Sequence, residues 1–179
     1  MQSVGIDNLT LRDITLEANC TTGVLSHYFR HKNSVLRFSF TIACRKVFER
    51  LRTANKFVDS DLICLHNAMI EVLPDPKKSE SIAFVSMCFG IRNSNDLLLV
   101  EEYGANRGEY RDILKKYVAD SIKEGEIPGV KKIEDMLDLI LSVVDGVCIA
   151  SVLNPDDHTK KRCTRIIESM IERLKYSTE

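Results

Sequence analysis

Residues 10–32, TLRDITLEANCTTGVLSHYFRHK, contain two short helix patterns separated by a turn. Thr10 can accept a hydrogen bond from the amides of the first helix, and Asp13 occupies the matching capping-box position. Asn19 marks the turn, because asparagine tolerates a left-handed backbone better than most residues other than glycine. Thr21 can then cap the second helix. The stretch therefore predicts two consecutive short helices joined by a tight turn.

The second predicted helix has an exposed side of small, polar or methyl-bearing residues. Leu25 and Phe29 lie four positions apart and form its buried side. A surface of glycine and hydroxyl groups lets a helix approach another molecule closely, and a preceding helix across a tight turn can hold it in the major groove of DNA. The exposed residues are Thr22, Gly23, Val24, Ser26, His27 and Tyr28. We interpret this stretch as a helix-turn-helix.

The charge distribution agrees with this interpretation. The formal net charge of the chain is −1, but residues 1–56 contain nine basic and four acidic residues. The rest of the chain contains sixteen basic and twenty-two acidic residues. A basic N-terminal part on an acidic body indicates a polyanionic partner for that part alone. Chance is the alternative, because charge patterns are weak evidence by themselves.

The remainder of the chain also has a helical pattern. Apolar and polar residues do not alternate over any long run, so strand signals are poor. All four prolines lie between predicted helices, as expected of a residue that is excluded from helix interiors. The further helices are predicted at 33–55, 60–73, 79–92, 96–124, 133–153 and 158–175. The fold class is therefore all-α, with the helix-turn-helix as a DNA-binding domain at 1–36 and a larger helical body at 37–179, for which the family resemblance given below implies effector binding and dimerisation.

The predicted helix at 133–153 is apolar on more than one side and must be covered on both. Together with the helix at 158–175 it could form half of an intermolecular four-helix bundle around a two-fold axis. The alternative is that both apolar stripes belong to the core of a single subunit. The interface hypothesis names Leu139, Val143, Val147, Ala150, Ile167, Met170 and Leu174.

Several other functional classes are not supported. The six cysteines are scattered, without a metal-binding spacing, and no N-terminal stretch has the pattern of a secretion signal. We expect no apolar run of the ~18 residues needed to span a membrane, and hence a cytoplasmic protein. His27 and His31 are four positions apart, but no third ligand lies nearby. No nucleophile or phosphate-loop motif is present, so we expect no metal, no cofactor and no enzymatic activity.

The pattern of residues 10–36 resembles the DNA-binding head of the tetracycline-repressor (TetR) family of bacterial transcription regulators. The residues SHYF at 26–29 are similar to those of the branch typified by the repressor of choline-to-betaine genes. A looser similarity covers most of the chain. There are two departures: Asn19 replaces the usual glycine, and residues 1–9 lack the family's first helix, so we expect a loosely packed head. The matching residues are Thr10, Arg12, Ile14, Ala18, Gly23, Leu25, Tyr28, Phe29, Lys32 and Leu36.

The resemblance implies roles for the head residues. Contacts to DNA phosphates are implied for Thr10, Thr21, Tyr28 and Lys32. Core packing is the alternative role for Tyr28. Contacts in the major groove are implied for Arg12, Thr22, Gly23, Val24, Ser26 and His27.

The resemblance also implies an effector pocket in the body. An adaptable methionine and aromatic rings would suit an apolar or cationic small molecule, although ordinary core packing is the alternative. The candidate residues are Phe84, Met87, Cys88, Ile91, Tyr103, Tyr110 and Asp145. The expected partners are double-stranded operator DNA, a second copy of the chain and a small molecule. The competing hypothesis is an all-helical dimer that binds a small molecule or protein without touching DNA.

Overall fold

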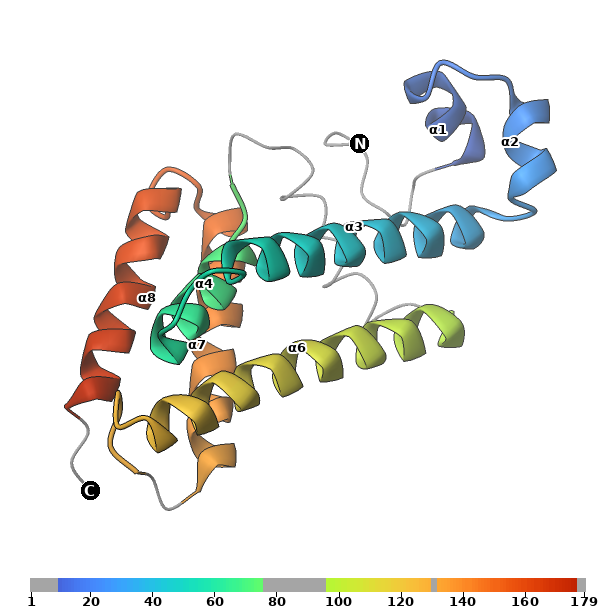
Figure 1. Cartoon of the computed structure of the whole chain (residues 1–179). Coiled ribbons are helices and arrows are strands. Elements are labelled where there is room, and N and C mark those ends of the chain that lie inside the picture. Colours follow the sequence, from blue (N-terminus) through green and yellow to red (C-terminus); the bar gives the residue numbers. More distant parts are fainter. Residues whose placement is uncertain (1–9, 76–95, 130–131, 177–179) are drawn as a thin grey trace.

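The computed structural model describes residues 10–75, 96–129 and 132–176, and the regular elements in these ranges are all helices (Figure 1). This confirms the predicted all-α class. The helices are α1 (Leu11–Glu17), α2 (Thr22–Tyr28), α3 (Lys32–Ala54), α4 (Asp61–Glu71), α6 (Leu97–Lys123), α7 (Ile133–Leu153) and α8 (Lys160–Lys175).

Short-range signals set the helix boundaries. Side chains at the N-cap positions of five helices accept hydrogen bonds from backbone amides of the first turn, as expected for Thr, Ser and Asp. The capping residues are Thr10, Thr21, Ser60, Asp96 and Thr159. The predicted helix at 79–92 lies outside the described residues.

The core lies where α3, α4, α6, α7 and α8 meet. Leu65, Leu114 and Ile140 are fully buried. The phenol of Tyr110 is also buried and donates a hydrogen bond to the carbonyl of Ala68 at 3.1 Å. Burial raises the pKa of Tyr110 above its ordinary value, because the phenolate is poorly solvated in the core.

The sequence of α7 corrects one expectation. This helix is 21 residues long with a mean hydropathy of 2.1, so by length and composition alone it could cross a membrane. Residues on one side of it, including Leu137 and Val144, are buried in the core of the chain. The opposite side is open, and Leu139 and Leu153 are 56% and 77% exposed. We therefore treat α7 as a core helix with one uncovered face.

Helix α3 joins the helix-turn-helix to the body. Figure 1 shows α1 and α2 at the N-terminal end of α3, away from α4, α7 and α8, while α6 runs beside α3. The expected domain boundary at 36–37 falls inside α3, which is one continuous helix. The direction of α3 therefore sets the position of α1 and α2, which we call the head.

Candidate nucleic-acid interface

Helix α1 begins with the predicted capping box. The hydroxyl oxygen of Thr10 accepts a hydrogen bond from the Asp13 amide at 3.2 Å, and the Asp13 carboxylate accepts one from the Thr10 amide at 2.9 Å. The Thr10 hydroxyl also donates to the Asp13 carboxylate at 2.5 Å, and this bond and the one from the Thr10 amide lower the pKa of Asp13. The reciprocal contacts hold the start of α1 in place although both side chains are accessible to solvent.

The turn between the helices has the predicted backbone. Asn19 has a φ of 49°, in the left-handed region that asparagine tolerates. The amide of Cys20 returns to the carbonyl of Thr15 at 3.0 Å. Thr21 then caps α2, and its hydroxyl accepts from the Val24 amide at 3.3 Å. The tight turn places α2 directly after α1, as a helix-turn-helix requires.

Helix α2 presents its predicted contact residues to solvent. Val24 is 53% exposed and Tyr28 is 74% exposed, so Tyr28 does not pack in the core. The His27 ring meets the Tyr28 ring edge-on, with the centroids 5.1 Å apart. The exposed side chains on and around this helix are those of Arg12, Thr21, Thr22, Ser26 and His27. The predicted groove residues are thus all exposed in the structure.

Gly23 lies on this surface without a structural need for glycine. A Cβ added there would meet only the Thr21 hydroxyl, at an ordinary contact distance of 3.9 Å. The carbonyl of Gly23 accepts a hydrogen bond from the Ser26 hydroxyl at 3.1 Å. The fold would therefore accept a larger residue at this position, whereas a closely approaching partner would not.

The end of the head adds basic residues that the sequence interpretation did not assign. Lys32 is half-buried at the first position of α3, while Arg30 and His31 beside it are exposed. His31 is the N-cap residue of α3 and makes no side-chain capping bond there. The sequence did contain a signal for this extension, because Arg30, His31 and Lys32 are consecutive and follow the second helix closely. These side chains extend the candidate phosphate-binding surface beyond Lys32.

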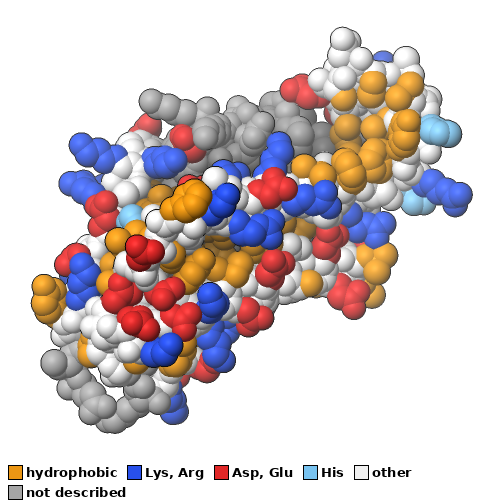
Figure 2. All heavy atoms as spheres, viewed as in Figure 1, with side chains coloured by type: hydrophobic (Ala, Val, Ile, Leu, Met, Phe, Trp, Pro, Cys, Tyr) orange, Lys and Arg blue, Asp and Glu red, His pale blue; other side chains and the backbone are white. Residues whose placement is uncertain are grey.

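The head is loosely packed, as expected. Leu25 and Phe29 are only half-buried, and the Phe29 ring lies 5.4 Å from the ring of Phe38, which is 55% exposed. Leu16 is 73% exposed. Figure 2 shows hydrophobic side chains gathered on this part of the molecule, at the upper right. The buried face of the head therefore gives it little packing energy of its own.

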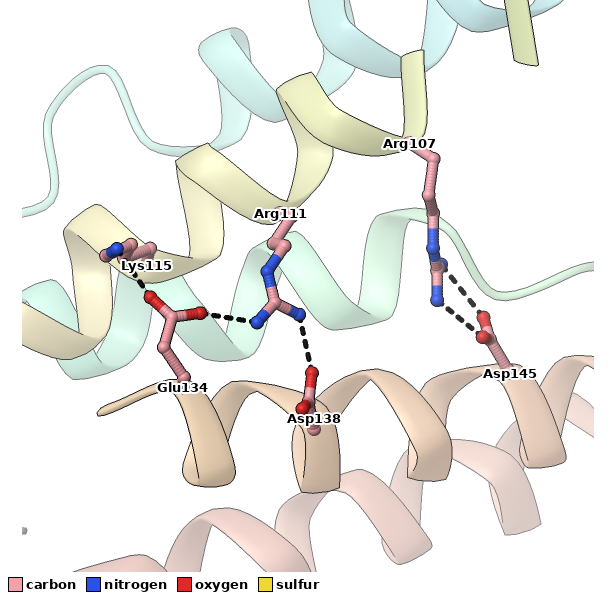
Figure 3. Close-up of polar contacts among 6 residues, drawn as sticks. All are labelled: Arg107, Arg111, Lys115, Glu134, Asp138 and Asp145. Atoms are coloured by element: carbon pink, nitrogen blue, oxygen red, sulfur yellow. Dashed lines mark hydrogen bonds and ion pairs between the residues drawn. The ribbon is translucent and has the colours of Figure 1, made fainter. Parts of the chain in front are cut away.

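Three of the seven candidate effector residues lie in the described part of the chain. Phe84, Met87, Cys88 and Ile91 lie outside the described residues. Tyr103 packs against the core, and Tyr110 is buried as described above. Asp145 pairs with Arg107 of α6 at 3.0 and 2.5 Å, as shown in Figure 3. Asp145 and Arg107 also lie close enough to Tyr110 to act on it electrostatically, and the effector pocket stays a prediction.

The candidate interface residues divide into two groups. Val147, Ile167 and Leu174 are at most 6% exposed and are used within the core of the subunit. Val143, Ala150 and Met170 are half-buried, and Leu139 is exposed. The open face of α7 has alternating spacings of four and three positions, which is the period of a helix-packing seam. This face, the α7 stripe, consists of Leu139, Val143, Gly146, Ala150 and Leu153, of which Val143 also packs against the core at the edge of the stripe.

Comparisons with known proteins identify the fold. No protein-family model matches the chain. The transcriptional regulator PksA of Bacillus subtilis, described as helix-turn-helix type, is 24% identical over 176 residues, which cover 95% of this chain and 82% of PksA. A transcriptional regulator from Saccharomonospora viridis, solved in complex with choline, superposes with a TM-score of 0.83 at 14% identity, covering 94% of this chain and 87% of that one.

A TetR transcription regulator from Haloarcula marismortui superposes with a TM-score of 0.81 at 16% identity, covering 97% of this chain and 90% of that one. The three relatives are named as transcriptional regulators, in agreement with the expectation that the chain is not an enzyme.

Proposed function

We propose that this chain, a transcriptional regulator with the fold of the TetR family, acts as a homodimeric repressor that a small-molecule effector releases from operator DNA. The observation that carries the proposal is the open surface of α2. Its side chains are small or polar, none is acidic, and a capped turn holds the helix at the far end of α3. A helix of this kind can enter a major groove without electrostatic repulsion.

Groove contacts are proposed for Arg12, Thr22, Gly23, Val24, Ser26 and His27. The Val24 methyl groups can contact a thymine methyl, and Thr22 or His27 can hydrogen-bond a base edge. Phosphate contacts are proposed for Thr10, Thr21, Tyr28 and Lys32. Such contacts position the head, while the groove contacts select the sequence.

The second copy is proposed to pack against the α7 stripe. Small residues at Gly146 and Ala150 allow a second helix to approach closely, and Leu139 and Leu153 supply apolar area. A two-fold dimer must present its two recognition helices about 34–36 Å apart to enter successive major grooves. An effector that binds the body better at another spacing lowers operator affinity by linkage.

The placement in the choline/betaine-repressor branch is the finer part of the proposal. The SHYF spelling at residues 26–29 supports it, as does the fold shared with the choline-bound regulator. A cytoplasmic location follows from the proposal, since operator DNA is found there.

The test is the salt dependence of binding to the DNA upstream of the gene. Lys32→Ala should weaken binding to all duplexes and flatten the plot of log affinity against log salt by roughly one unit, because one phosphate contact is lost. Fluorescence anisotropy with a labelled duplex measures this slope. Lys46→Ala is the matched control, because Lys46 is an exposed lysine of the same helix in the body.

An unchanged slope for Lys32→Ala would remove Lys32 from the phosphate contacts. Absence of any binding by the wild-type protein at low salt would instead support the competing hypothesis of a helical dimer that does not bind DNA.

A further inference from the structure

Two polar contacts join the head-proximal half of α3 to the first turns of α6. The hydroxyl of Thr41 donates to the carboxylate of Glu102, and its oxygen also lies 3.0 Å from the Arg37 carbonyl of its own helix. Arg37, one turn earlier, brings its Nε to 3.9 Å from Oδ2 of Asp96. Oδ1 of Asp96 meanwhile accepts from the Leu99 amide at 3.2 Å and so caps α6. We call these two contacts, Thr41–Glu102 and Arg37–Asp96, the α3–α6 clasp.

An aromatic contact lies between the two halves of the clasp. Phe40 is 1% exposed, and its ring centroid lies 6.1 Å from that of Tyr103. Burial of apolar surface is non-directional and does not by itself select one rotation of a helix against its neighbour. A hydrogen bond weakens steeply when its angle changes. The Thr41–Glu102 hydrogen bond of the clasp therefore adds a defined rotation and register to the contact between α3 and α6, and the longer Arg37–Asp96 ion pair adds electrostatic attraction.

Because of its position along α3, a change at the clasp would displace the head by a larger distance. Thr41 is nine residues from Lys32, about 13 Å along the helix at 1.5 Å per residue. Beyond the clasp, α3 is anchored in the core through Val47, Phe48 and Leu51. A small tilt of α3 at Thr41 moves α2 by a larger distance, because the head lies at the end of this rod (Figure 1).

We propose that the α3–α6 clasp is a positioning device that sets the spacing of the two recognition helices in the dimer. Thr41 and Glu102 are then positioning residues, which touch no DNA and yet determine which separation of half-sites the protein accepts. The inference rests on the proposed function, since spacing has a meaning only for a DNA-binding dimer.

The first experiment is a selection from a random duplex DNA library, with enriched sequences read for half-site sequence and separation. Thr41→Val and Glu102→Gln should enrich the same half-site as the wild type, because α2 is intact, but with a shifted or broader distribution of separations. Thr41→Ser should restore the wild-type distribution. Thr53→Val is the matched control, because the Thr53 hydroxyl bonds only the Glu49 carbonyl of its own helix among the contacts of the described chain, at 2.8 Å.

The second experiment needs no DNA. Amide hydrogen exchange over residues 33–43 should be about fivefold faster in Thr41→Val than in the wild type, as expected when one charge-assisted hydrogen bond is lost, and unchanged in Thr53→Val. Unaltered separations, or unaltered exchange, in Thr41→Val and Glu102→Gln would overturn the proposal. If the wild type enriches no duplex, the proposed function fails, and the exchange measurement alone then decides whether the clasp holds α3.

Discussion

At the scale of single residues, the helix-turn-helix at residues 10–28 differs from the core in what constrains each position. Thr10, Asn19 and Thr21 are constrained by the local backbone, because each satisfies an amide or adopts a turn conformation. Gly23 is constrained by neither packing nor backbone. Its neighbours on α2 are exposed as well. A position that the fold leaves free is the place where a partner can determine the residue.

Gly23→Ala separates these two kinds of constraint. The substitution should leave thermal stability unchanged or raise it slightly, because alanine is the better helix former by roughly 0.5–1 kcal/mol. Operator affinity should fall roughly tenfold, a loss of the size of one base contact. Thermal denaturation and anisotropy titration measure the two effects. Gly104→Ala, at an open position of α6, should change the affinity little; equal affinities of all three proteins would contradict a close approach at Gly23.

At the scale of helices, α4 is held at its start by a residue from a distant loop. Glu126, which follows α6, accepts a hydrogen bond from the Leu62 amide at 2.8 Å, and Ser60 accepts from the Ile63 amide at 3.1 Å. Burial raises the pKa of Glu126, but hydrogen bonds to the Ser60 side chain and the Leu62 amide outweigh it, and the net pKa is lowered. The carboxylate therefore ties the end of α6 to the beginning of α4.

Glu126→Gln should destabilise the protein by about 1 kcal/mol at neutral pH, as expected when a charged cap becomes neutral. Because the folded-state pKa is lowered, this contribution is present above the unfolded pKa, near 4.5, and disappears as the pH falls through the folded value. Urea denaturation of both proteins at pH 7 and in acid measures the difference. Glu124→Gln, at an exposed neighbouring position, is the control. A difference that persists in strong acid would show that charge is not the cause.

Three basic residues of α6 face acidic residues of α7 along one side of the body (Figure 3). Arg111 contacts Glu134 at 2.5 Å and Asp138 at 2.7 Å, and Lys115 contacts Glu134 at 2.5 Å. Hydrogen bonds to Asp138 and Glu134 raise the pKa of Arg111. Together with the Arg107–Asp145 pair, these contacts form a row between α6, which meets α3, and α7, which carries the α7 stripe.

Arg111→Gln should lower the thermal midpoint at low ionic strength, because two carboxylates lose their shared cation. The difference from the wild type should shrink in 1 M salt, since accessible ion pairs are screened. Differential scanning calorimetry at the two salt concentrations gives the result. Lys123→Gln removes an exposed charge that pairs only with its neighbour Glu124 among the described residues, at 3.8 Å, and should have little effect. Equal destabilisation at both salt concentrations would indicate lost packing instead.

At the scale of the whole molecule, the proposed two-fold dimer uses the open α7 stripe as its interface. Leu139→Lys should convert the dimer to a monomer, because a charge on the stripe would be buried without a partner. The subunit itself should keep its helical content, since Leu139 is 56% exposed within it. Sedimentation velocity and circular dichroism measure these properties. Leu97→Lys is the control at another exposed leucine; a dimer that survives Leu139→Lys would place the interface elsewhere.

Much of the architecture could be predicted from the sequence. The parts that could not be predicted were missed for one common reason. The all-α class, the capping box, the left-handed Asn19 and the exposed side of α2 follow from residues within a few positions of one another. The same patterns did not show that Ile167 and Leu174 lie inside the subunit, or that Asp145 is paired with Arg107. Periodicity identifies the residues that share a face of a helix, but it does not identify what covers that face.

The sequence by itself therefore determined the helices, their caps and the character of the recognition surface, because these depend on hydrogen bonds and steric limits within one or two turns of chain. Only the tertiary structure decided which side of α7 is open, that the distant Glu126 binds the start of α4, and where α3 is clasped to α6. Those features join residues such as Thr41 and Glu102, which are 61 positions apart. Such pairs meet only when whole helices have packed against one another. Because burial of apolar faces is non-directional, the sequence pattern of one helix does not specify which residues of another helix it will contact.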